Sequence, residues 1–249
     1  MIEIKSLYKT FNAGRVNEVK SLQNVNLSIN KGDFLILLGA NGSGKSTLLN
    51  SISGSILAES GSIEIEGIDV SRFPEYKRSP WIARVFQNPL SGTASDLTIL
   101  ENFRLATLRT QSKNLKIGIN NKFKSLVKDR VALLGMGLEH KLDQPIGTLS
   151  GGQRQALTLL MCVMDDLKIL LLDEPTAALD PRSAQLVMQT ADKVIRDFDL
   201  TAIMVTHNMK DALAYGNRIV QMNDGKVARD ISTEQKSKLA VADLYEWFG

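Results

Sequence analysis

The segment that decides the fold begins at residue 39 and reads Gly39-Ala40-Asn41-Gly42-Ser43-Gly44-Lys45-Ser46. Before it, residues 34–38 read FLILL, a continuous apolar run typical of a strand buried on both faces. After it, residues 45–53 read as a helix that Gly54 stops. The order of strand, glycine-rich loop and helix therefore indicates an α/β protein.

The glycine-rich loop fits the phosphate-binding pattern GxxxxGK[ST]. Glycines let the backbone fold around an anion with its N–H groups inward, and the helix that follows adds the positive end of its dipole. We expect Lys45 to reach the β- and γ-phosphates and the Ser46 hydroxyl to ligate Mg²⁺. Thr47, at the start of the helix, should support this phosphate site. The alternative is a glycine-rich turn that binds nothing, against which the flanking strand and helix argue.

The regular elements alternate along most of the chain. Strand signals lie at Val25, Leu27 and Ile29, and again at 62–67 and 84–86. We expect a helix from 151 to about 165, a strand at 168–173, a helix from 181 to about 198 and a strand at 201–206. This alternation predicts a mostly parallel sheet covered by helices. Residues 96–145 have helical periodicity, so they predict a helical insertion.

Length, charge and cysteine usage limit the class of protein. The chain has 249 residues, which suits one large α/β domain or two small ones. Its net charge of +3 is spread without a basic block, so no nucleic-acid partner is expected. The single cysteine, Cys162, reads as a small buried hydrophobe in a protein of a reducing compartment. No apolar run approaches the roughly 18 residues of a membrane span, and the N-terminus predicts no secretory signal.

Two adjacent carboxylates, Asp173 and Glu174, follow the apolar run 169–172. They stand at the C-terminal end of a predicted buried strand, where ligands bind in open α/β sheets. A phosphate-bound Mg²⁺ would partner Asp173, and Glu174 would orient or deprotonate a water that attacks the γ-phosphate. The alternative is that the pair caps the following turn at 175–176.

A second glycine-rich helix start lies at Leu149-Ser150-Gly151-Gly152-Gln153. Ser150 is a natural N-cap, and the two glycines leave the first-turn amides unshielded. A phosphate loop already accounts for one nucleotide, so this helix start suggests contact with a γ-phosphate from another side, or from another subunit. Alone, it would read as an ordinary serine-capped helix.

Together these segments resemble the ABC ATPase family, whose signature LSGGQ stands uninterrupted at residues 149–153. The ordered set of phosphate loop, Gln87, signature, carboxylate pair, Asp180 and His207 covers nearly the whole chain, from about Phe11 to His207. The resemblance implies a P-loop core with a mostly parallel sheet, an antiparallel β subdomain and an inserted α-helical subdomain. We expect one ABC domain over 1–249, with its core at 1–88 and 150–225, the helical subdomain at 89–149 and a C-terminal tail at 226–249.

The resemblance also implies roles for single residues. Phe11 looks like the aromatic residue that stacks on adenine. Gln87 matches the glutamine that contacts Mg²⁺ and the attacking water, and Asp180 the loop aspartate that couples two sites of a dimer. His207 matches the histidine that bonds the γ-phosphate and holds the water with Glu174. The other histidine, His140, reads as a surface residue at a helix end without a role.

The partners that the resemblance implies are a second cassette, which completes each ATP site with its signature, and transmembrane permease subunits. These place the chain in the cytoplasm, peripheral to the inner face of the cytoplasmic membrane. Residues 149–161, 173–188 and 205–227 look similar to cassettes of importers that use an extracytoplasmic substrate-binding protein, including a group assigned to aromatic amino acids. Two alternatives stay open: an export or lipoprotein-release cassette, and a soluble ABC ATPase that acts as an assembly factor.

Overall fold

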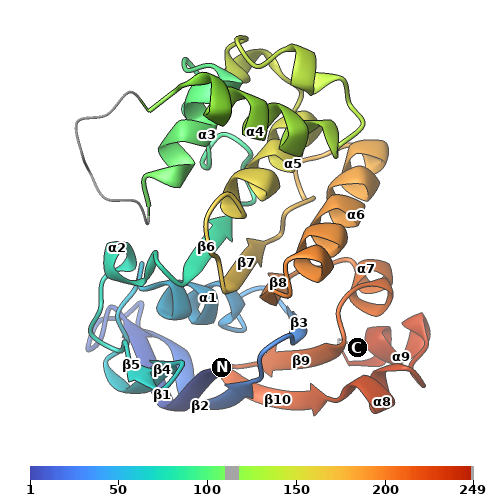
Figure 1. The fold of residues 1–249 in the computed structure, drawn as a ribbon. Coiled ribbons are helices and arrows are strands. Elements are labelled where there is room, and N and C mark those ends of the chain that lie inside the picture. Colours follow the sequence, from blue (N-terminus) through green and yellow to red (C-terminus); the bar gives the residue numbers. More distant parts are fainter. Residues whose placement is uncertain (110–117, 248–249) are drawn as a thin grey trace. The chain divides into compact units, whose positions relative to one another are not determined.

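A computed structural model describes residues 1–109 and 118–247 (Figure 1). Contacts within the chain divide it into two compact units. Unit 1 comprises Met1–Ile82 and Leu200–Gly249, and unit 2 comprises Ala83–Asp199. The expected division at residues 89, 150 and 226 stays a prediction.

The N-terminal part of unit 1 is an antiparallel sheet with the strand order β2-β1-β4-β5. Its strands are β1 (Ile2–Phe11), β2 (Val19–Ile29), β4 (Ser60–Ile65) and β5 (Ile68–Asp69). Val25, Leu27 and Ile29 of β2 are buried and alternate with exposed residues, as their spacing predicts for a half-buried strand. This sheet is the antiparallel part of the predicted fold class.

The second sheet of unit 1 is built around β3 (Phe34–Gly39), all of whose residues are buried. Two strands flank it in parallel, β8 (Thr201–Val205) and β9 (Arg218–Asn223), and β10 (Lys226–Ile231) pairs antiparallel with β9. A strand with parallel neighbours on both sides needs apolar residues on both faces, which explains the unbroken run FLILL. The predicted α/β class with a mostly parallel sheet is confirmed.

Helix α1 (Lys45–Ser53) follows β3 and has the predicted bounds, with Gly54 as its left-handed C-cap. Its last turn rests on Arg78, which is 1% exposed and ends α2 (Glu75–Arg78). Arg78 Nη1 donates to the carbonyls of Ser51 and Ile52, at 2.8 and 2.9 Å. Burial lowers the pKa of Arg78 to about 10, so the guanidinium remains charged at neutral pH and satisfies these carbonyls.

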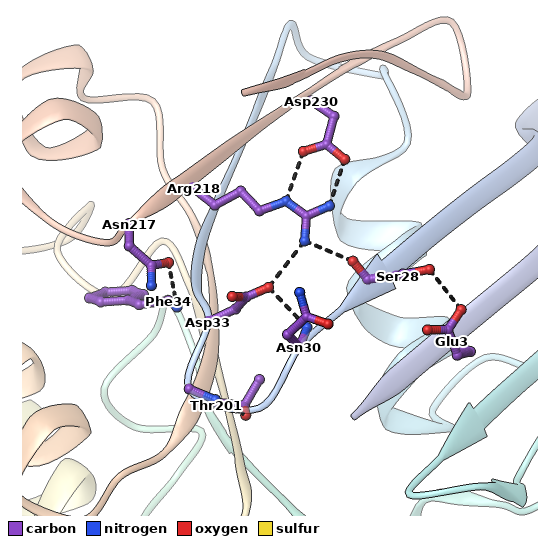
Figure 2. A network of polar contacts seen from close by, with 10 residues as sticks. Glu3, Ser28, Asn30, Asp33, Phe34, Thr201, Asn217, Arg218 and Asp230 are labelled. Atoms are coloured by element: carbon purple, nitrogen blue, oxygen red, sulfur yellow. Dashed lines mark hydrogen bonds and ion pairs between the residues drawn. The ribbon is translucent and has the colours of Figure 1, made fainter. Parts of the chain in front are cut away.

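A polar network around Arg218 joins the two sheets of unit 1 (Figure 2). Arg218 makes two bonds to the Asp230 carboxylate, at 2.8 and 2.6 Å, and Nη1 lies 3.0 Å from Asp33 Oδ2. Nη1 also donates to the Ser28 carbonyl of β2 at 2.8 Å. Asp33 immediately precedes β3, so the network fixes the N-terminal end of β3. The glycine-rich loop follows the other end of this strand.

Three more helices complete unit 1. They are α7 (Met209–Ala214), α8 (Thr233–Lys236) and α9 (Val241–Glu246), the last two after β10 (Figure 1). Trp247, after α9, accepts a bond from Gln221 Nε2 at 3.0 Å and packs against the Arg229 guanidinium 5.0 Å from its ring centroid. These contacts attach the end of the described chain to β9 and β10.

Unit 2 contains β7 (Ile169–Asp173), all of β6 (Ile82–Val85) except its first residue, and most of the helical residues; the two strands are hydrogen-bonded neighbours. Its helices are α3 (Ile99–Thr107), α4 (Asn121–Ala132), α5 (Gly151–Cys162) and α6 (Pro181–Asp197), with 3₁₀ turns Leu138–His140 and Ile146–Thr148. Helices α5 and α6 pack together. In the described part of 96–145 the only β pairing is an isolated bridge between Thr98 and Pro145, in line with the predicted helical character.

Several predicted boundaries are wrong by a few residues. Strand β4 ends at Ile65 because Glu66 and Gly67 adopt positive φ values of 51° and 78° and turn the chain. Strand β6 covers Ile82–Val85, and Phe86 lies beyond it. Helix α5 ends at Cys162 instead of residue 165.

Two predictions for minor features are confirmed, the burial of Cys162 and the surface position of His140. Cys162 is buried, and burial raises the pKa of its thiol to about 11, so it is an unreactive small hydrophobe. His140 ends a 3₁₀ turn with an exposed side chain. In the described residues, no helix is long and apolar enough to cross a membrane.

Candidate functional site

The glycine-rich loop of unit 1 runs from the end of β3 to the start of α1, and its glycines are needed for conformation and close approach. Gly39, Gly42 and Gly44 have φ values of 156°, 81° and 101°, in the left-handed region that side chains disfavour. A Cβ on Gly39 would lie 2.5 Å from the Met222 carbonyl oxygen, and one on Gly44 would overlap the Ser21 carbonyl oxygen. The loop can adopt this shape only because these three positions carry no side chain.

Two polar side chains of this loop, those of Ser43 and Lys45, are buried. Lys45 is 5% exposed, and its Nζ donates to the carbonyls of Gly39 and Ala40 at 2.8 and 2.9 Å. Ser43 Oγ is buried and, within the described residues, lacks a hydrogen-bond partner. A buried hydroxyl without a partner is costly, and an oxygen of a bound phosphate would satisfy it. The cradle therefore fits a phosphate group, held by the start of α1.

The next two residues differ in exposure. Ser46 is exposed, so its hydroxyl is accessible to a metal ion at the phosphates. Thr47 is half-buried, and its hydroxyl shares a 2.7 Å hydrogen bond with Ser21 of β2. Thr47 therefore anchors the start of α1, in line with the supporting role expected of it.

Unit 1 also contains Phe11 and His207. Phe11 ends β1 opposite Val19, half-buried, with the Lys9 ammonium 5.4 Å from its ring centroid. His207 is exposed and follows β8 two residues after its end. The next residue, Asn208, caps α7 by accepting from the backbone of Lys210 and Asp211, at 3.0 and 3.3 Å. His207 thus lies between a buried strand and a capped helix, which limits its backbone freedom.

The carboxylate pair lies in unit 2, at the end of β7. Glu174 has a φ of 46°, a strained value for a residue with a long side chain and one that occurs often at functional sites. The turn after it is closed by the Ala177 N–H donating to the Glu174 carbonyl at 3.1 Å. Asp173 Oδ2 accepts from Arg84 Nη2 of β6 at 2.5 Å. Asp173 therefore has a cationic side chain as partner.

Gln87 and Asp180 belong to the same unit. Gln87 is exposed in a bend two residues after β6. Asp180 is the N-cap of α6 and accepts from the backbone of Arg182 and Ser183, each at 3.1 Å. Hydrogen bonding with Ser183 lowers the pKa of Asp180 below its usual value, so its carboxylate is ionised at neutral pH.

The segment 149–153 opens α5 with the predicted cap. Ser150 Oγ accepts from the Gln153 N–H at 3.3 Å, and Gln153 Oε1 accepts from the Ser150 N–H at 3.1 Å. This reciprocal pair is a capping box. Gly152 is buried, and a Cβ there would lie 2.6 Å from Ser183 Cβ of α6. Close helix packing is therefore a second reason for glycine, beyond the exposed amides that the sequence suggests.

The structure distributes the predicted residues over both units. The phosphate loop Gly39–Thr47, Phe11 and His207 lie in unit 1, and Gln87, the carboxylates, 149–153 and Asp180 lie in unit 2. Sequence reasoning overlooked two residues that bond to these segments: Arg84, the partner of Asp173, and Gln155, which donates to the Phe86 and Pro175 carbonyls. The signal for each was available, since a charged residue in a short buried strand and an amide in an apolar helix are both unusual.

A glycine cradle for phosphate between a buried parallel strand and a helix defines the P-loop nucleotide-binding class. The family model described as ABC transporter matches residues 22–177, and the chain belongs to this family. It is an ATP-binding cassette with ATPase activity and serves as the ATP-binding subunit of a transporter.

Relatives and solved structures agree with this assignment. The tyrosine transport ATP-binding protein of Clostridioides difficile (strain R20291) is 40% identical over 100% of this chain and 98% of its own length. The macrolide export ATP-binding/permease protein MacB of Campylobacter fetus subsp. fetus (strain 82-40) is 33% identical, over 92% of this chain and 34% of its own length. The dimeric cassette MJ0796 bound to ADP and Pi in a post-hydrolysis state has a TM-score of 0.78 at 29% identity, over 94% of this chain and 99% of its own.

Proposed function

We propose that this cassette drives the import of an aromatic amino acid, with tyrosine as the first substrate to test. The observation that carries the proposal is the 40% identity to the tyrosine transport ATP-binding protein, which extends over the whole chain. The match to MacB keeps export as the second candidate, although that protein contains a permease part that this chain does not cover. Cargo and direction depend on the permease, because the chemistry of the ATP site is the same in both cases.

For the ATP site we propose the roles that the sequence predicts. The cradle Gly39–Thr47 holds the phosphates. The unpartnered Ser43 hydroxyl and the Lys45 ammonium, which bonds to carbonyls of the same loop, support this role. Phe11 stacks on the adenine. Glu174 acts as general base, with Gln87 and His207 placing the water, and the positive φ of Glu174 supports a functional site at this residue.

Mg²⁺ neutralises charge on the phosphates when it is bound with ATP. We propose Ser46, Gln87 and Asp173 as the residues that hold it. The exposed Ser46 hydroxyl and the Asp173 carboxylate have the oxygen chemistry that Mg²⁺ prefers.

We further propose that two copies of the chain form the working pair, with Leu149–Gln153 of each binding the ATP of the other and Asp180 coupling the two sites. The dimeric cassette similar to this chain supports the pairing. The dimer would dock on transmembrane permease subunits at the inner face of the cytoplasmic membrane and work with an extracytoplasmic substrate-binding protein.

Two experiments test these proposals separately. For the site, Glu174→Gln should abolish ATP turnover and trap an ATP-bound dimer, measured by phosphate release and by size-exclusion chromatography with ATP. Wild-type turnover in this variant would disprove the general-base role. For the cargo, uptake of labelled tyrosine, phenylalanine and tryptophan is compared in cells with and without the gene. Lower uptake, restored by the wild-type gene but not by Glu174→Gln, supports import; higher accumulation indicates export.

A further inference from the structure

Gln155 is a buried amide in the otherwise apolar part of α5. Its side chain is 1% exposed, and the residues that follow it in the helix are buried and mostly apolar. A buried amide is retained only where its donors are satisfied, so its partners indicate its purpose.

Both partners of Gln155 adjoin residues of the proposed ATP site. Its Nε2 donates to the Phe86 carbonyl at 2.8 Å and to the Pro175 carbonyl at 3.1 Å. Phe86 immediately precedes Gln87, and Pro175 immediately follows Glu174. One amide group therefore connects the signature helix to the segments that carry Gln87 and Glu174, at the ends of β6 and β7.

Close packing around α5 makes this connection stiff. A Cβ on Gly151 would lie 3.0 Å from Leu179 Cδ2, and one on Gly152 would lie 2.6 Å from Ser183 Cβ, so the helix start rests on the segment after Pro175. Farther along α5, Thr158 Cγ2 would be 3.0 Å from a Cβ on Gly92, which belongs to the segment after Gln87. Close-packed elements transmit displacements instead of absorbing them.

We propose that Gln155 is a positioning residue that couples the signature helix to Gln87 and Glu174. A displacement of α5, as when the signature binds the ATP of a second copy, moves the Phe86 and Pro175 carbonyls and so aligns Gln87 and Glu174. The inference rests on the roles proposed for these two residues. The Nε2 group of Gln155 donates to backbone carbonyls beside these residues, so its loss should impair turnover more than ATP binding.

The test variant is Gln155→Met, which keeps the length and approximate volume of the side chain and removes both donors. We expect kcat for ATP hydrolysis to fall about tenfold or more, while KM and the equilibrium affinity for ATP change by less than about twofold. The matched control is Gln189→Met, the same change at an exposed glutamine of α6, which should leave kcat unchanged. A kcat for Gln155→Met within about twofold of the wild type, or an increase in KM that alone accounts for the loss, overturns the proposal.

Hydrogen exchange provides a readout that is independent of activity. Gln155→Met should accelerate amide exchange in peptides that cover 84–88 and 173–177 without acceleration in peptides of β3 and α1. Uniform acceleration would indicate general destabilisation and contradict a positioning role. If Gln155→Met does not fold, Gln155→Asn, which keeps two N–H donors one methylene shorter, replaces it. Gln155→Asn should show a smaller loss of kcat and the same acceleration of amide exchange at 84–88 and 173–177. Faster exchange in these peptides together with an unchanged kcat would overturn the coupling.

Glu174→Gln is measured in parallel to separate the two proposals. If Glu174→Gln turns over ATP at the wild-type rate, the proposed function of Glu174 fails, whatever Gln155→Met does. If Glu174→Gln is inactive and Gln155→Met is fully active, the proposed coupling by Gln155 is wrong, and the proposed role of Glu174 stands.

Discussion

Arg84 and Asp173 form an ion pair across adjacent strands β6 and β7, with side chains that are 11% and 16% exposed. The Arg84 guanidinium also packs on the Phe86 ring, 4.8 Å from its centroid, which holds it in place. Asp173 is the carboxylate proposed to ligate Mg²⁺, so Arg84 and the metal ion compete for the same negative charge.

Arg84→Met should therefore lower the Mg²⁺ concentration needed to support ADP binding, by about tenfold. The measurement is a titration of Mg²⁺, or of Mn²⁺ detected by its paramagnetic resonance, at fixed ADP. Arg84→Lys keeps the positive charge and should resemble the wild type. Equal metal requirements in all three proteins would show that Arg84 does not oppose the metal.

The contact of Gly152 with Ser183 gives a second prediction. Gly152→Ala places a methyl group 2.6 Å from Ser183 Cβ, so α5 and α6 must separate, and overpacking of this kind costs about 1–3 kcal/mol. The free energy of unfolding in urea measures the loss. Ser183→Gly removes the opposing atoms, so the double variant should lose less than the sum of the two single variants. Strict additivity would contradict the packing explanation.

The Arg218 network of unit 1 gives a third prediction. Arg218→Met removes both bonds to Asp230 and leaves Asp33, at 17% exposure, without this partner (Figure 2). We expect a loss of about 2 kcal/mol, between the values for exposed and buried ion pairs. Lys238→Met is the control in the same unit: it breaks an exposed pair with Glu234 and should cost less than about 0.5 kcal/mol. Equal losses in the two variants would show that the network adds nothing to stability.

Lys236 gives a prediction about pH. Its Nζ donates to the Gly216 carbonyl at 2.7 Å and to the Tyr215 carbonyl, just after α7, and burial lowers the pKa of Lys236 from 10.5 to about 8. Between pH 8 and 10.5 the unfolded chain therefore binds more protons here than the folded chain, and this residue's contribution to stability rises with pH. Below pH 8 both states are charged and the contribution is flat.

The measurement is the free energy of unfolding of the wild type minus that of Lys236→Met at several pH values. This difference should increase from pH 8 to pH 10. A difference that is constant or falls over this range would show that the folded-state pKa of Lys236 is not depressed.

The sequence predicts best the elements whose signals are local. Helix α1 has its predicted bounds because a glycine stands at each end and both adopt left-handed conformations, Gly44 at 101° and Gly54 at 85°. The buried strand β3 was equally clear, because both of its faces need apolar residues. Strand β4 was predicted too long because residues that alternate in polarity continue into a turn at Glu66, which only its backbone angles reveal.

The pairings between distant parts of the chain could not be predicted. Arg84 reaches Asp173, and Gln155 reaches Phe86 and Pro175, only because folding brings β6, β7 and α5 together. No local pattern specifies such partners. The sequence therefore indicates candidate site residues such as Asp173 and Glu174. The fold is needed to find the residues that contact their segments, Arg84 and Gln155.

The support of α1 by Arg78 has a consequence for genetic variation. The helix whose first turn faces the phosphate cradle is fixed at its last turn by a guanidinium bonded to the Ser51 and Ile52 carbonyls. A substitution at position 78 would loosen the far end of the helix and so change the direction of its first amides. In a screen scored only by ATP hydrolysis, position 78 would be grouped with the phosphate loop, although its side chain contacts residues at the opposite end of the helix.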